Sequence, residues 1–387
     1  MKKTPWAVAV LVLVLVLGLA SLLSACGGTE ETTTTAGPAT TAGPTTTAAP
    51  VTTAAPTTTA APETTTTADD GKKYEFKFSY PTSTRASLYE TYLLPWADAI
   101  QAASSGRVTI THYPDNALVK EEQQLDALLS GTSDMGLIEM EFTPGVFPKT
   151  EVVSLPLLFP NAEVAARVFW DMMQTDFADE FKDVQVLAVT VIAPAQYCGT
   201  KPFKTPADMK GLRMRTGGPV ETQIIGALGG TATEVGSADL ATSMERGMFD
   251  GAFLSYSYMK VTGAMDFATN ATECDLFRRC WVLAMNKDKW ESLPAAVQKT
   301  FLDESTIEKQ VAYVVANDAA GVEDRDLINK KTGGSGGIYV MTADEKAALK
   351  TALAPVYAEW VKDLGADKNG QAILDKIAEL VTKYSTK

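Results

Sequence analysis

The chain has 387 residues, and 45% of them are hydrophobic, which is enough for one or two globular domains with large cores. Its formal net charge of −13 argues against nucleic-acid binding, because phosphate contacts require a basic surface. The single histidine, His112, excludes a multi-histidine metal centre and leaves one candidate base for a serine or cysteine hydrolase. No motif points to a cofactor.

The first 25 residues have the pattern of an export signal. Lys2 and Lys3 precede an apolar run over 7–20, and a cleavage region with small residues follows over 23–27. The run is short for a membrane-spanning helix, which needs about 20 residues. A permanent N-terminal anchor helix is the alternative interpretation.

Residues 26–73 begin with Cys26 and continue as a tract rich in threonine, alanine and proline. The tract contains no aromatic residue before Tyr74, and Val51 is its one sizeable apolar side chain. Such a composition cannot bury enough surface to offset the entropy of ordering, so we expect a disordered, extended linker.

Predicted strands and helices alternate from residue 74 onward. In the first part the predicted strands are 74–78, 108–113, 135–138 and 184–193, and the predicted helices are 92–103, 121–129 and 161–181. The first strand alternates apolar and charged residues, whereas the last is apolar throughout, as is typical of a strand covered on both faces. Repeated strand–helix units favour a mostly parallel sheet with helices on both sides.

The second half continues the alternation and adds helices at its end. The predicted strands are 210–215, 250–254 and 277–286, and the predicted helices are 219–228, 237–246, 294–329, 342–364 and 371–384. We expect a loop after Leu254 and a glycine-rich break over 330–337. The pattern over 294–329 is long enough to brace two lobes, so the class expected is an α/β protein of two lobes.

Several short motifs in this order resemble a known family. From about residue 74 to 325 the chain is similar to the extracytoplasmic solute-binding proteins of TRAP transporters, the DctP-type family. The matching stretches are 105–110 (SGRVTI), 134–137 (DMGL), 144–148 (PGVFP), 155–159 (LPLLF), 208–215 (DMKGLRMR), 228–230 (LGG), 241–251 (ATSMERGMFDG) and 290–294 (WESLP).

The resemblance implies a two-lobed α/β binding-protein fold with mixed sheets, hinge strands and a long lobe-spanning helix. Lobe I is expected over 74–193 plus about 281–325, and lobe II over 194–280 plus about 326–387. It further implies that the protein is not an enzyme. Instead, it traps a small organic acid by hinge closure and delivers it to the small and large membrane subunits of a permease.

The segment Leu23-Ser24-Ala25-Cys26 resembles a bacterial lipobox. This resemblance implies that Cys26 becomes the lipid-modified N-terminus of the mature protein. Lipid chains would then hold an extracytoplasmic protein on the membrane, with the 26–73 tract as a tether.

Arg215 is the main candidate for ligand binding. In the family, the second arginine of this motif meets the substrate carboxylate, and a guanidinium can hold a carboxylate with two parallel hydrogen bonds. The alternative is a structural salt bridge with an acid such as Glu221. Arg213, two positions away on the same strand, is expected to be solvated.

Other candidates follow from the same resemblance. Family members place a further polar ligand contact near Gln196, although a turn residue is the alternative there. Where relatives carry a polar motif after the 250–254 strand, this chain has Phe253, Ser255 and Tyr256, which predicts an apolar or aromatic wall and an acid with an apolar or ring-bearing body.

The first lobe offers candidates in its loops, because α/β proteins bind ligands at the carboxyl ends of parallel strands. They are Tyr89 and Arg85 after the first strand, together with Ser83, and Glu139 after the third. Arg85 is either a second cation for the ligand or a solvated loop residue, and Glu139 either accepts from a hydroxyl or amine or lies on the rim. His112 is expected to be an ordinary surface or edge residue.

With Cys26 lipidated, three cysteines remain, namely Cys198, Cys274 and Cys280. One disulfide plus one free thiol is the simplest expectation outside the cytoplasm, and the sequence does not choose the pair. No Cys-x-x-Cys motif is present.

Three rival functions stay open at this point. An ABC-type solute-binding lipoprotein would use the same physics with another permease, and a ligand-sensing module would contact a receptor. A secreted hydrolase or isomerase would need a nucleophile with a base, and the sequence has no second histidine.

Overall fold

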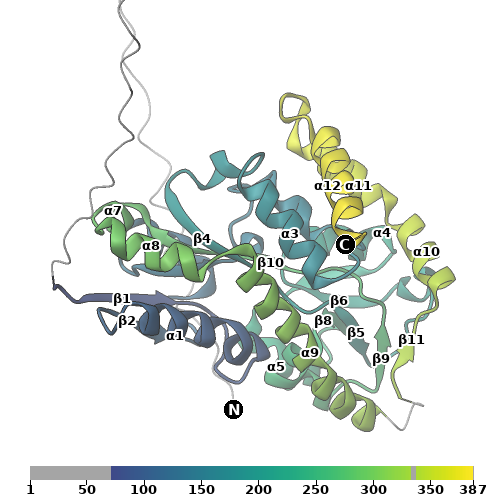
Figure 1. Ribbon diagram of the computed structural model, residues 1–387. Coiled ribbons are helices and arrows are strands. Elements are labelled where there is room, and N and C mark those ends of the chain that lie inside the picture. The colour runs from purple at the N-terminus through teal and green to yellow at the C-terminus, as the bar shows by residue number, and fades with distance from the viewer. Residues whose placement is uncertain (1–70, 333–336, 387) are drawn as a thin grey trace, which may run out of the picture. The chain divides into compact units, whose positions relative to one another are not determined.

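The computed structural model describes residues 71–332 and 337–386 (Figure 1). The predicted export signal, Cys26 and the linker as far as residue 70 lie outside the described residues. In the described part of the chain, no helix is both long and apolar enough to span a bilayer.

The described strands form two separate sheets. The strands are β1 (Tyr74–Ser79), β2 (Val108–Tyr113), β3 (Met135–Ile138), β4 (Val184–Val191), β5 (Gln196–Gly199), β6 (Arg213–Thr216), β7 (Thr231–Glu234), β8 (Gly251–Leu254), β9 (Asn270–Glu273), β10 (Cys280–Asn286) and β11 (Tyr339–Val340). Sheet A has the order β2-β1-β3-β10-β4, and sheet B has the order β11-β9-β5-β8-β6-β7. The two-lobed α/β class that the sequence predicts is confirmed.

Both sheets are mixed, so the mostly parallel sheet expected from the strand–helix alternation is wrong. In sheet A, β1 runs parallel to β2 and β3, whereas β10 is antiparallel to β3 and β4. In sheet B, β5 is antiparallel to both β8 and β9. The reason is that β5 and β10 enter their sheets from the opposite sheet instead of through a crossover helix.

Two chain segments cross between the sheets, 192–195 after β4 and 274–279 before β10. They are hydrogen-bonded to each other: Ile192 N donates to Arg279 O at 2.8 Å, Ala195 N to Phe277 O at 2.8 Å, and Leu276 N to Ala195 O at 3.0 Å. The predicted strands 184–193 and 277–286 are therefore shorter in the structure: β4 ends at Val191, β10 begins at Cys280, and the residues between belong to the paired crossing segments.

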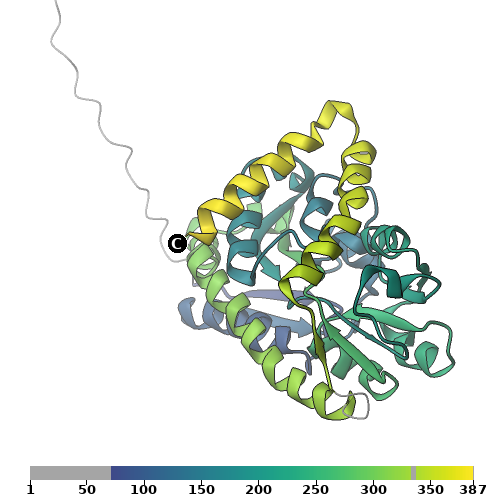
Figure 2. The same ribbon diagram turned by 90° about the vertical axis from the view of Figure 1, so that its right-hand side faces the viewer.

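The helices surround the two sheets. They are α1 (Leu94–Ala103), α2 (Gln124–Leu129), α3 (Ala162–Met173), α4 (Pro219–Ala227), α5 (Leu240–Glu245), α6 (Tyr256–Val261), α7 (Lys287–Glu291), α8 (Ala295–Glu304), α9 (Ile307–Lys331), α10 (Ala343–Ala352), α11 (Ala354–Leu364) and α12 (Gly370–Ser385), with a π-helical turn η1 (Tyr89–Leu93) before α1. Near the C-terminus, α11 packs on α4 and α12 packs on α3 (Figure 2).

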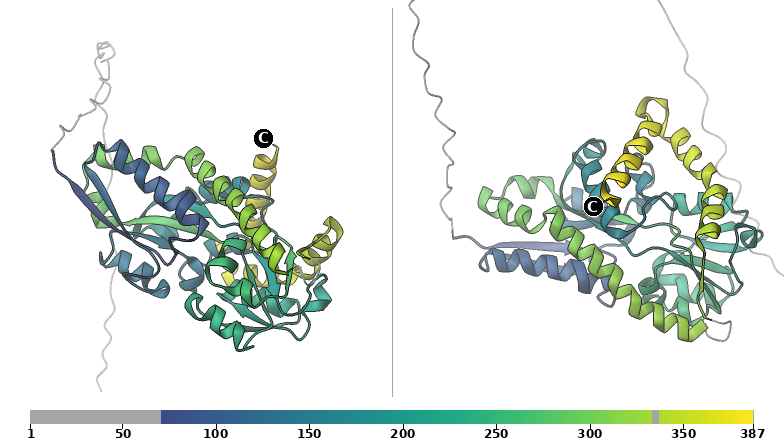
Figure 3. Two further views of the ribbon diagram at one scale, coloured as in Figure 1. Left: turned by 90° about the horizontal axis from the view of Figure 1, so that it is seen from below. Right: turned by 45° about the vertical axis from the view of Figure 1, so that its right-hand side comes forward.

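Helix α9 is the longest and serves both sheets. Its 25 residues extend roughly 37 Å. It packs against α3, η1 and β4 beside sheet A and against α6 beside sheet B (Figure 3). The predicted helix 294–329 is interrupted at Ser305, whose buried hydroxyl accepts a hydrogen bond from Trp96 Nε1 at 3.0 Å, and at Thr306, whose backbone is extended. Similarly, α11 begins as a new helix within the predicted 342–364 element, with Pro355 in its first turn.

The three cysteines of the described chain are free and buried, so the expected disulfide is wrong. Cys198 lies in the smaller hydrophobic cluster beside sheet B, whereas Cys274 and Cys280 lie in the larger one. Cys280 begins a strand of sheet A and Cys274 follows a strand of sheet B. Burial raises the pKa of the Cys198 and Cys274 thiols to about 12, which keeps them protonated and unreactive.

Candidate binding cleft between the two sheets

A cavity of about 360 Å³ lies where the two sheets face each other, and we call it the cleft. Sheet A contributes the loops after β1, β2 and β3, and sheet B contributes residues of β6 and β8 with helix α6. Both crossing segments line it, as does Asn317 of α9. The volume is within the range of small-molecule sites, and a ligand here would contact both lobes at once.

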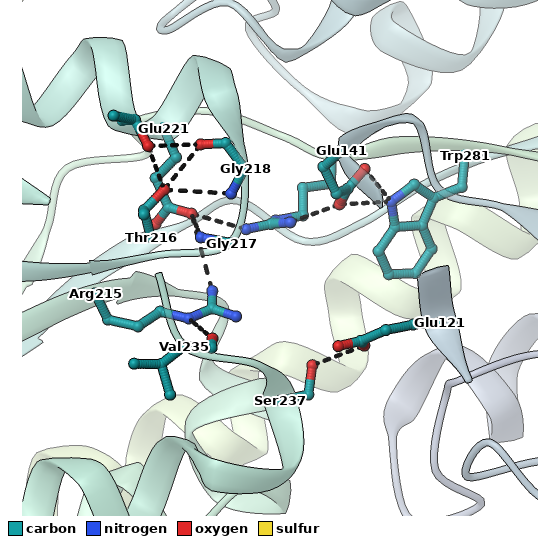
Figure 4. Close-up of polar contacts among 12 residues, drawn as sticks. Glu121, Glu141, Arg215, Thr216, Gly217, Gly218, Glu221, Val235, Ser237 and Trp281 are labelled. Carbon is teal, nitrogen blue, oxygen red and sulfur yellow. Dashed lines mark hydrogen bonds and ion pairs between the residues drawn. The ribbon is translucent and has the colours of Figure 1, made fainter. Parts of the chain in front are cut away.

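Arg215 extends into this cleft from β6. The side chain is 1% exposed. Its Nε donates to Val235 O at 2.9 Å, and its Nη1 lies 3.9 Å from Glu221 Oε2 (Figure 4). Nη1 makes no hydrogen bond to any described residue. A buried cationic donor without an acceptor is a strong feature, because such groups are nearly always satisfied in folded proteins.

Arg213 begins β6, two residues before Arg215, and does not line the cleft. Strand alternation alone would place both side chains on one face, so tertiary contacts separate them. The backbone N and guanidinium of Arg213 bind the Asp250 carboxylate at 2.9–3.3 Å. Arg213 is therefore solvent-exposed, as predicted, and it also forms an ion pair with Asp250.

A second arginine, Arg279, also lines the cleft, and the sequence reasoning missed it. Its Nη1 donates to Glu141 Oε1 at 2.5 Å, and its Nη2 donates to Glu221 Oε2 at 3.0 Å. Burial alone would lower the pKa of Arg279, but the carboxylates of Glu141 and Glu221 outweigh burial and raise the pKa above its ordinary value. Trp281 Nε1 also donates to Glu141, at 3.0 Å. These contacts join the loop after β3 to helix α4 of the other sheet.

Two adjacent glycines make room for this arrangement. A Cβ on Gly217 would lie 2.6 Å from Arg215 Nη1 and 2.9 Å from Arg279 Nη2, and a Cβ on Gly218 would lie 2.9 Å from Glu141 Cβ. The backbone N of Gly217 donates to Glu221 Oε2 at 2.8 Å. The glycine pair therefore lets the two guanidiniums approach the backbone of the β6–α4 connection.

Glu139 follows β3 and lines the cleft from the side of sheet A. It is 7% exposed, and its Oε1 has no hydrogen-bond partner among the described residues. Burial, followed by repulsion from Glu141 and Glu121, raises the pKa of Glu139 well above its usual range. Glu121, also in the cleft, accepts from Ser237 Oγ at 3.1 Å, and this hydrogen bond joins the two sides.

The cleft also has an apolar and aromatic part beside its polar residues. Phe253 and Leu254 from β8, Phe277 and Ile192 from the crossing segments, and Trp281 from β10 all line the cleft. Aromatic side chains contribute large apolar contact area and favour stacked or edge-on partners.

The structure brings six of the predicted site residues to the cleft: Arg215, Phe253, Ser255, Glu139, Arg85 and Ser83. Arg85 is exposed and lies in the loop after β1. The hydroxyl of Ser255 caps α6, accepting from Tyr258 N at 3.3 Å.

Three predicted residues do not line the cleft. Gln196 is buried at the start of β5, where its amide binds the chain after β9: Nε2 donates to Asp275 Oδ1 at 2.6 Å, and Oε1 accepts from the backbone N of Cys274 at 2.8 Å. Tyr89 lies in η1, and its ring contacts Tyr80 and His112.

The third is Tyr256, whose hydroxyl donates to Glu273 Oε2 at 3.1 Å. The predicted loop after Leu254 is in fact helix α6, and residues two apart on a helix point in nearly opposite directions. Consequently Tyr258, not Tyr256, lines the cleft.

His112 is half-buried on β2, at the edge of sheet A. Its Nδ1 lies 2.6 Å from the hydroxyl of Tyr80, and burial lowers its pKa. The residue does not line the cleft. Over the described residues, no group of three or more histidine, cysteine or acidic side chains is arranged to hold a metal ion.

The family model that matches this chain and two of its sequence relatives describe solute-binding proteins. The family model for bacterial extracellular solute-binding protein family 7, DctP, matches residues 78–363. Among sequence relatives, a solute-binding protein of Chromohalobacter salexigens is 24% identical over 69% of this chain and 79% of its own length. The C4-dicarboxylate-binding periplasmic protein DctP of Rhodobacter capsulatus is 26% identical over 68% of this chain and 80% of its own.

Solved structures of TRAP solute-binding proteins share the fold. One from Rhodoferax ferrireducens T118, in complex with copurified benzoate, is 28% identical with a TM-score of 0.77 and covers 81% of this chain and 99% of its own. A marine metagenome protein specific for aromatic acid ligands, in complex with 3-hydroxybenzoate, is 25% identical with a TM-score of 0.74 and the same coverage of both chains.

Proposed function

This chain belongs to bacterial extracellular solute-binding protein family 7, the substrate-binding components of TRAP-type transport, and on that premise we propose that its cleft captures an aromatic monocarboxylate. One observation carries the proposal. The buried Nη1 of Arg215 has no hydrogen-bond partner among the described residues, and it lines a cleft walled by Phe253, Phe277 and Trp281.

The two ends of an aromatic carboxylate match two parts of the cleft, the Arg215 guanidinium and the aromatic side chains. A carboxylate accepts from the guanidinium of Arg215 in a site with little water, where a charge-assisted hydrogen bond is strong. An aromatic ring then buries its faces against the aromatic side chains. Arg279 favours a single carboxylate over a dicarboxylate, because the carboxylates of Glu141 and Glu221 already compensate its positive charge.

Capture requires no bond making or breaking. A ligand that touches both lobes stabilises the closed arrangement relative to the open one, and the two hydrogen-bonded crossing segments are the natural hinge. The closed protein would then deliver the acid to the small and large membrane subunits of the permease, with no turnover. The ring-bearing acids bound by the two TRAP structures above support this ligand class.

Titration calorimetry tests the ligand class with matched pairs. Benzoate and 3-hydroxybenzoate are expected to bind. Benzamide, which has the same shape without the charge, should bind at least about 30-fold more weakly, since an unpaired buried charge partner costs 2 kcal/mol or more. Cyclohexanecarboxylate should be intermediate, because it keeps the charge and loses the aromatic faces. Equal affinity for benzamide and benzoate, or tighter binding of succinate than of benzoate, would contradict the proposal.

We further propose that Cys26 is lipidated and holds the protein on the outer face of the cell membrane. The support is the Leu-Ser-Ala-Cys motif after a basic and apolar segment, followed by the tether-like tract. In a bacterial host fed an alkyne fatty acid, the full chain should become labelled. Cys26→Ser should abolish labelling, and Cys198→Ser, which changes a buried thiol, should not. Equal labelling of the parent and Cys26→Ser would contradict lipidation at this site.

A further inference from the structure

We propose that the acid captured by this cleft carries a hydroxyl group on its ring, and that the Glu139 carboxyl group and the Asn116 amide recognise this hydroxyl. The inference rests on the proposed function, since it takes the ligand carboxylate to be held by Arg215. It adds a second polar group to the ligand and assigns the residues that read it.

The first observation is the unused oxygen of Glu139. This side chain is more than nine-tenths buried and lines the cleft, and its Oε1 has no hydrogen-bond partner among the described residues. The residue is held at the end of β3, between β1 and β10 in sheet A. A buried polar atom without a partner is rare in a folded protein and indicates that something else supplies the contact.

The second observation is that Asn116 has the same property. Its Oδ1 is buried without a partner among the described residues, and the residue lines the cleft. Asn116 follows β2 and has φ of 60°, a left-handed conformation that asparagine tolerates better than most residues. Strand β1 lies between β2 and β3 and is parallel to both, so the residues that follow β2 and β3 lie at the same end of these strands.

These atoms give the cleft two chemically different sides. Sheet B presents an unused donor, Arg215 Nη1, and sheet A presents two unused acceptors. A ligand with an anionic acceptor at one end and a hydroxyl at the other can pair with all three, because the hydroxyl donates its one proton to one oxygen of sheet A and accepts from the Glu139 carboxyl group in its neutral form. Unsubstituted benzoate supplies the first and leaves both oxygens of sheet A unsatisfied.

A hydroxyl fits this donor role better than an ammonium group. An ammonium would require a charged carboxylate, but burial and the neighbouring acids raise the pKa of Glu139 and favour its neutral form. The neutral acid both donates and accepts, as does a hydroxyl. Glu121, the other acid with a raised pKa in the cleft, already accepts from Ser237.

The test compares ligand pairs that differ only in the donor. Calorimetry with the full chain uses benzoate, 3- and 4-hydroxybenzoate, and the two matching methoxybenzoates, which keep the oxygen and lose the donor. At least one hydroxybenzoate should bind roughly 5- to 100-fold more tightly than both benzoate and its own methyl ether, since it supplies a partner to an otherwise unsatisfied buried group.

Three variants assign the effect to its residues. Glu139→Met removes the acceptor at similar size and should abolish most of the hydroxyl preference. Glu139→Gln keeps an acceptor oxygen and should retain the preference. Asn116→Gly, which tolerates the positive φ, should reduce it.

The possible failures are distinguishable. If benzoate binds well and both hydroxybenzoates bind no better than benzoate, the hydroxyl inference is wrong and the proposed function stands. If Glu139→Met is folded, as judged by thermal unfolding, and keeps the full preference, the assignment to Glu139 is wrong. If no aromatic carboxylate binds the parent, both proposals are overturned together.

Discussion

Replacing Arg215 with methionine removes the guanidinium and keeps most of the buried alkyl volume. In the parent protein, this side chain makes one hydrogen bond, to Val235 O, and a longer ion pair with Glu221 at 3.9 Å. Glu221 keeps its contacts with Arg279 and with Gly217 N when Arg215 is lost. The unliganded fold should therefore change in stability by only about 1 kcal/mol, the net value of one hydrogen bond.

The effect on ligand binding should be much larger. Without the guanidinium, the carboxylate of benzoate would be buried with no cation in reach of its former position, which costs about 2–5 kcal/mol. This free energy corresponds to a roughly 30- to 5000-fold weaker Kd. The assay is calorimetric titration with benzoate, accompanied by thermal unfolding with and without ligand. Arg215→Met should lose the ligand-dependent rise in Tm while its Tm without ligand stays close to that of the parent.

Arg213→Met is the matched control, because it makes the same substitution on the same strand with the side chain facing solvent and Asp250. Loss of an exposed ion pair costs at most about 1 kcal/mol of stability, and benzoate affinity should stay unchanged. If Arg215→Met binds benzoate as tightly as Arg213→Met does, the carboxylate is held elsewhere and the interpretation of the cleft is wrong.

Three further predictions follow from the same region. The raised pKa of Glu139 means that the folded state keeps a proton that the unfolded state releases above about pH 4.5, so the free energy of unfolding should fall as pH rises from there. In Tm measured from pH 4.5 to 8, Glu139→Gln should show a flatter decline than the parent. Equal declines in Tm would count against the raised pKa. Glu141→Gln removes a carboxylate from Arg279 and should lower Tm. It should also raise benzoate affinity several-fold, because the positive charge of Arg279 is then less compensated. Weaker benzoate binding would contradict this charge argument. Gly217→Ala places a methyl group against both guanidiniums and should weaken benzoate binding at least tenfold. The control Gly226→Ala adds a methyl group in open space on α4 and should bind benzoate as the parent does. Equal affinities of the two variants would show that the guanidiniums move aside at no cost.

Sequence reasoning could identify Arg215 because it lies in a recognisable motif, whereas strand alternation alone would place it on the same face as Arg213. It could not identify Arg279. Arg278 and Arg279 are adjacent, and Arg278 binds Asp318 at 2.9 Å, away from the two acids that hold Arg279. The crossing of the chain between the sheets decides which of the two faces the cleft, and no local pattern encodes that crossing.

The errors around β5 and α6 have a similar cause. The segment after Leu254 is too short for helical periodicity to be evident, so we expected a loop there instead of α6. For this reason Tyr256, and not Tyr258, was expected to line the cleft. Gln196 was expected near the ligand because of its position between lobes, but its amide satisfies backbone groups after β9. In both cases the residue types were appropriate and the direction of the side chain depended on tertiary contacts.

The position of β10 governs the order in which the protein can assemble. This strand lies in the interior of sheet A, between β3 and β4, although it is made after all the strands of sheet B except β11. An emerging chain that ends before residue 280 therefore has β4 without its neighbour and β3 with an open edge. The N-terminal half cannot finish folding as an independent unit, and truncations or fusions placed between β9 and β10 should yield insoluble fragments, unlike insertions in exposed loops.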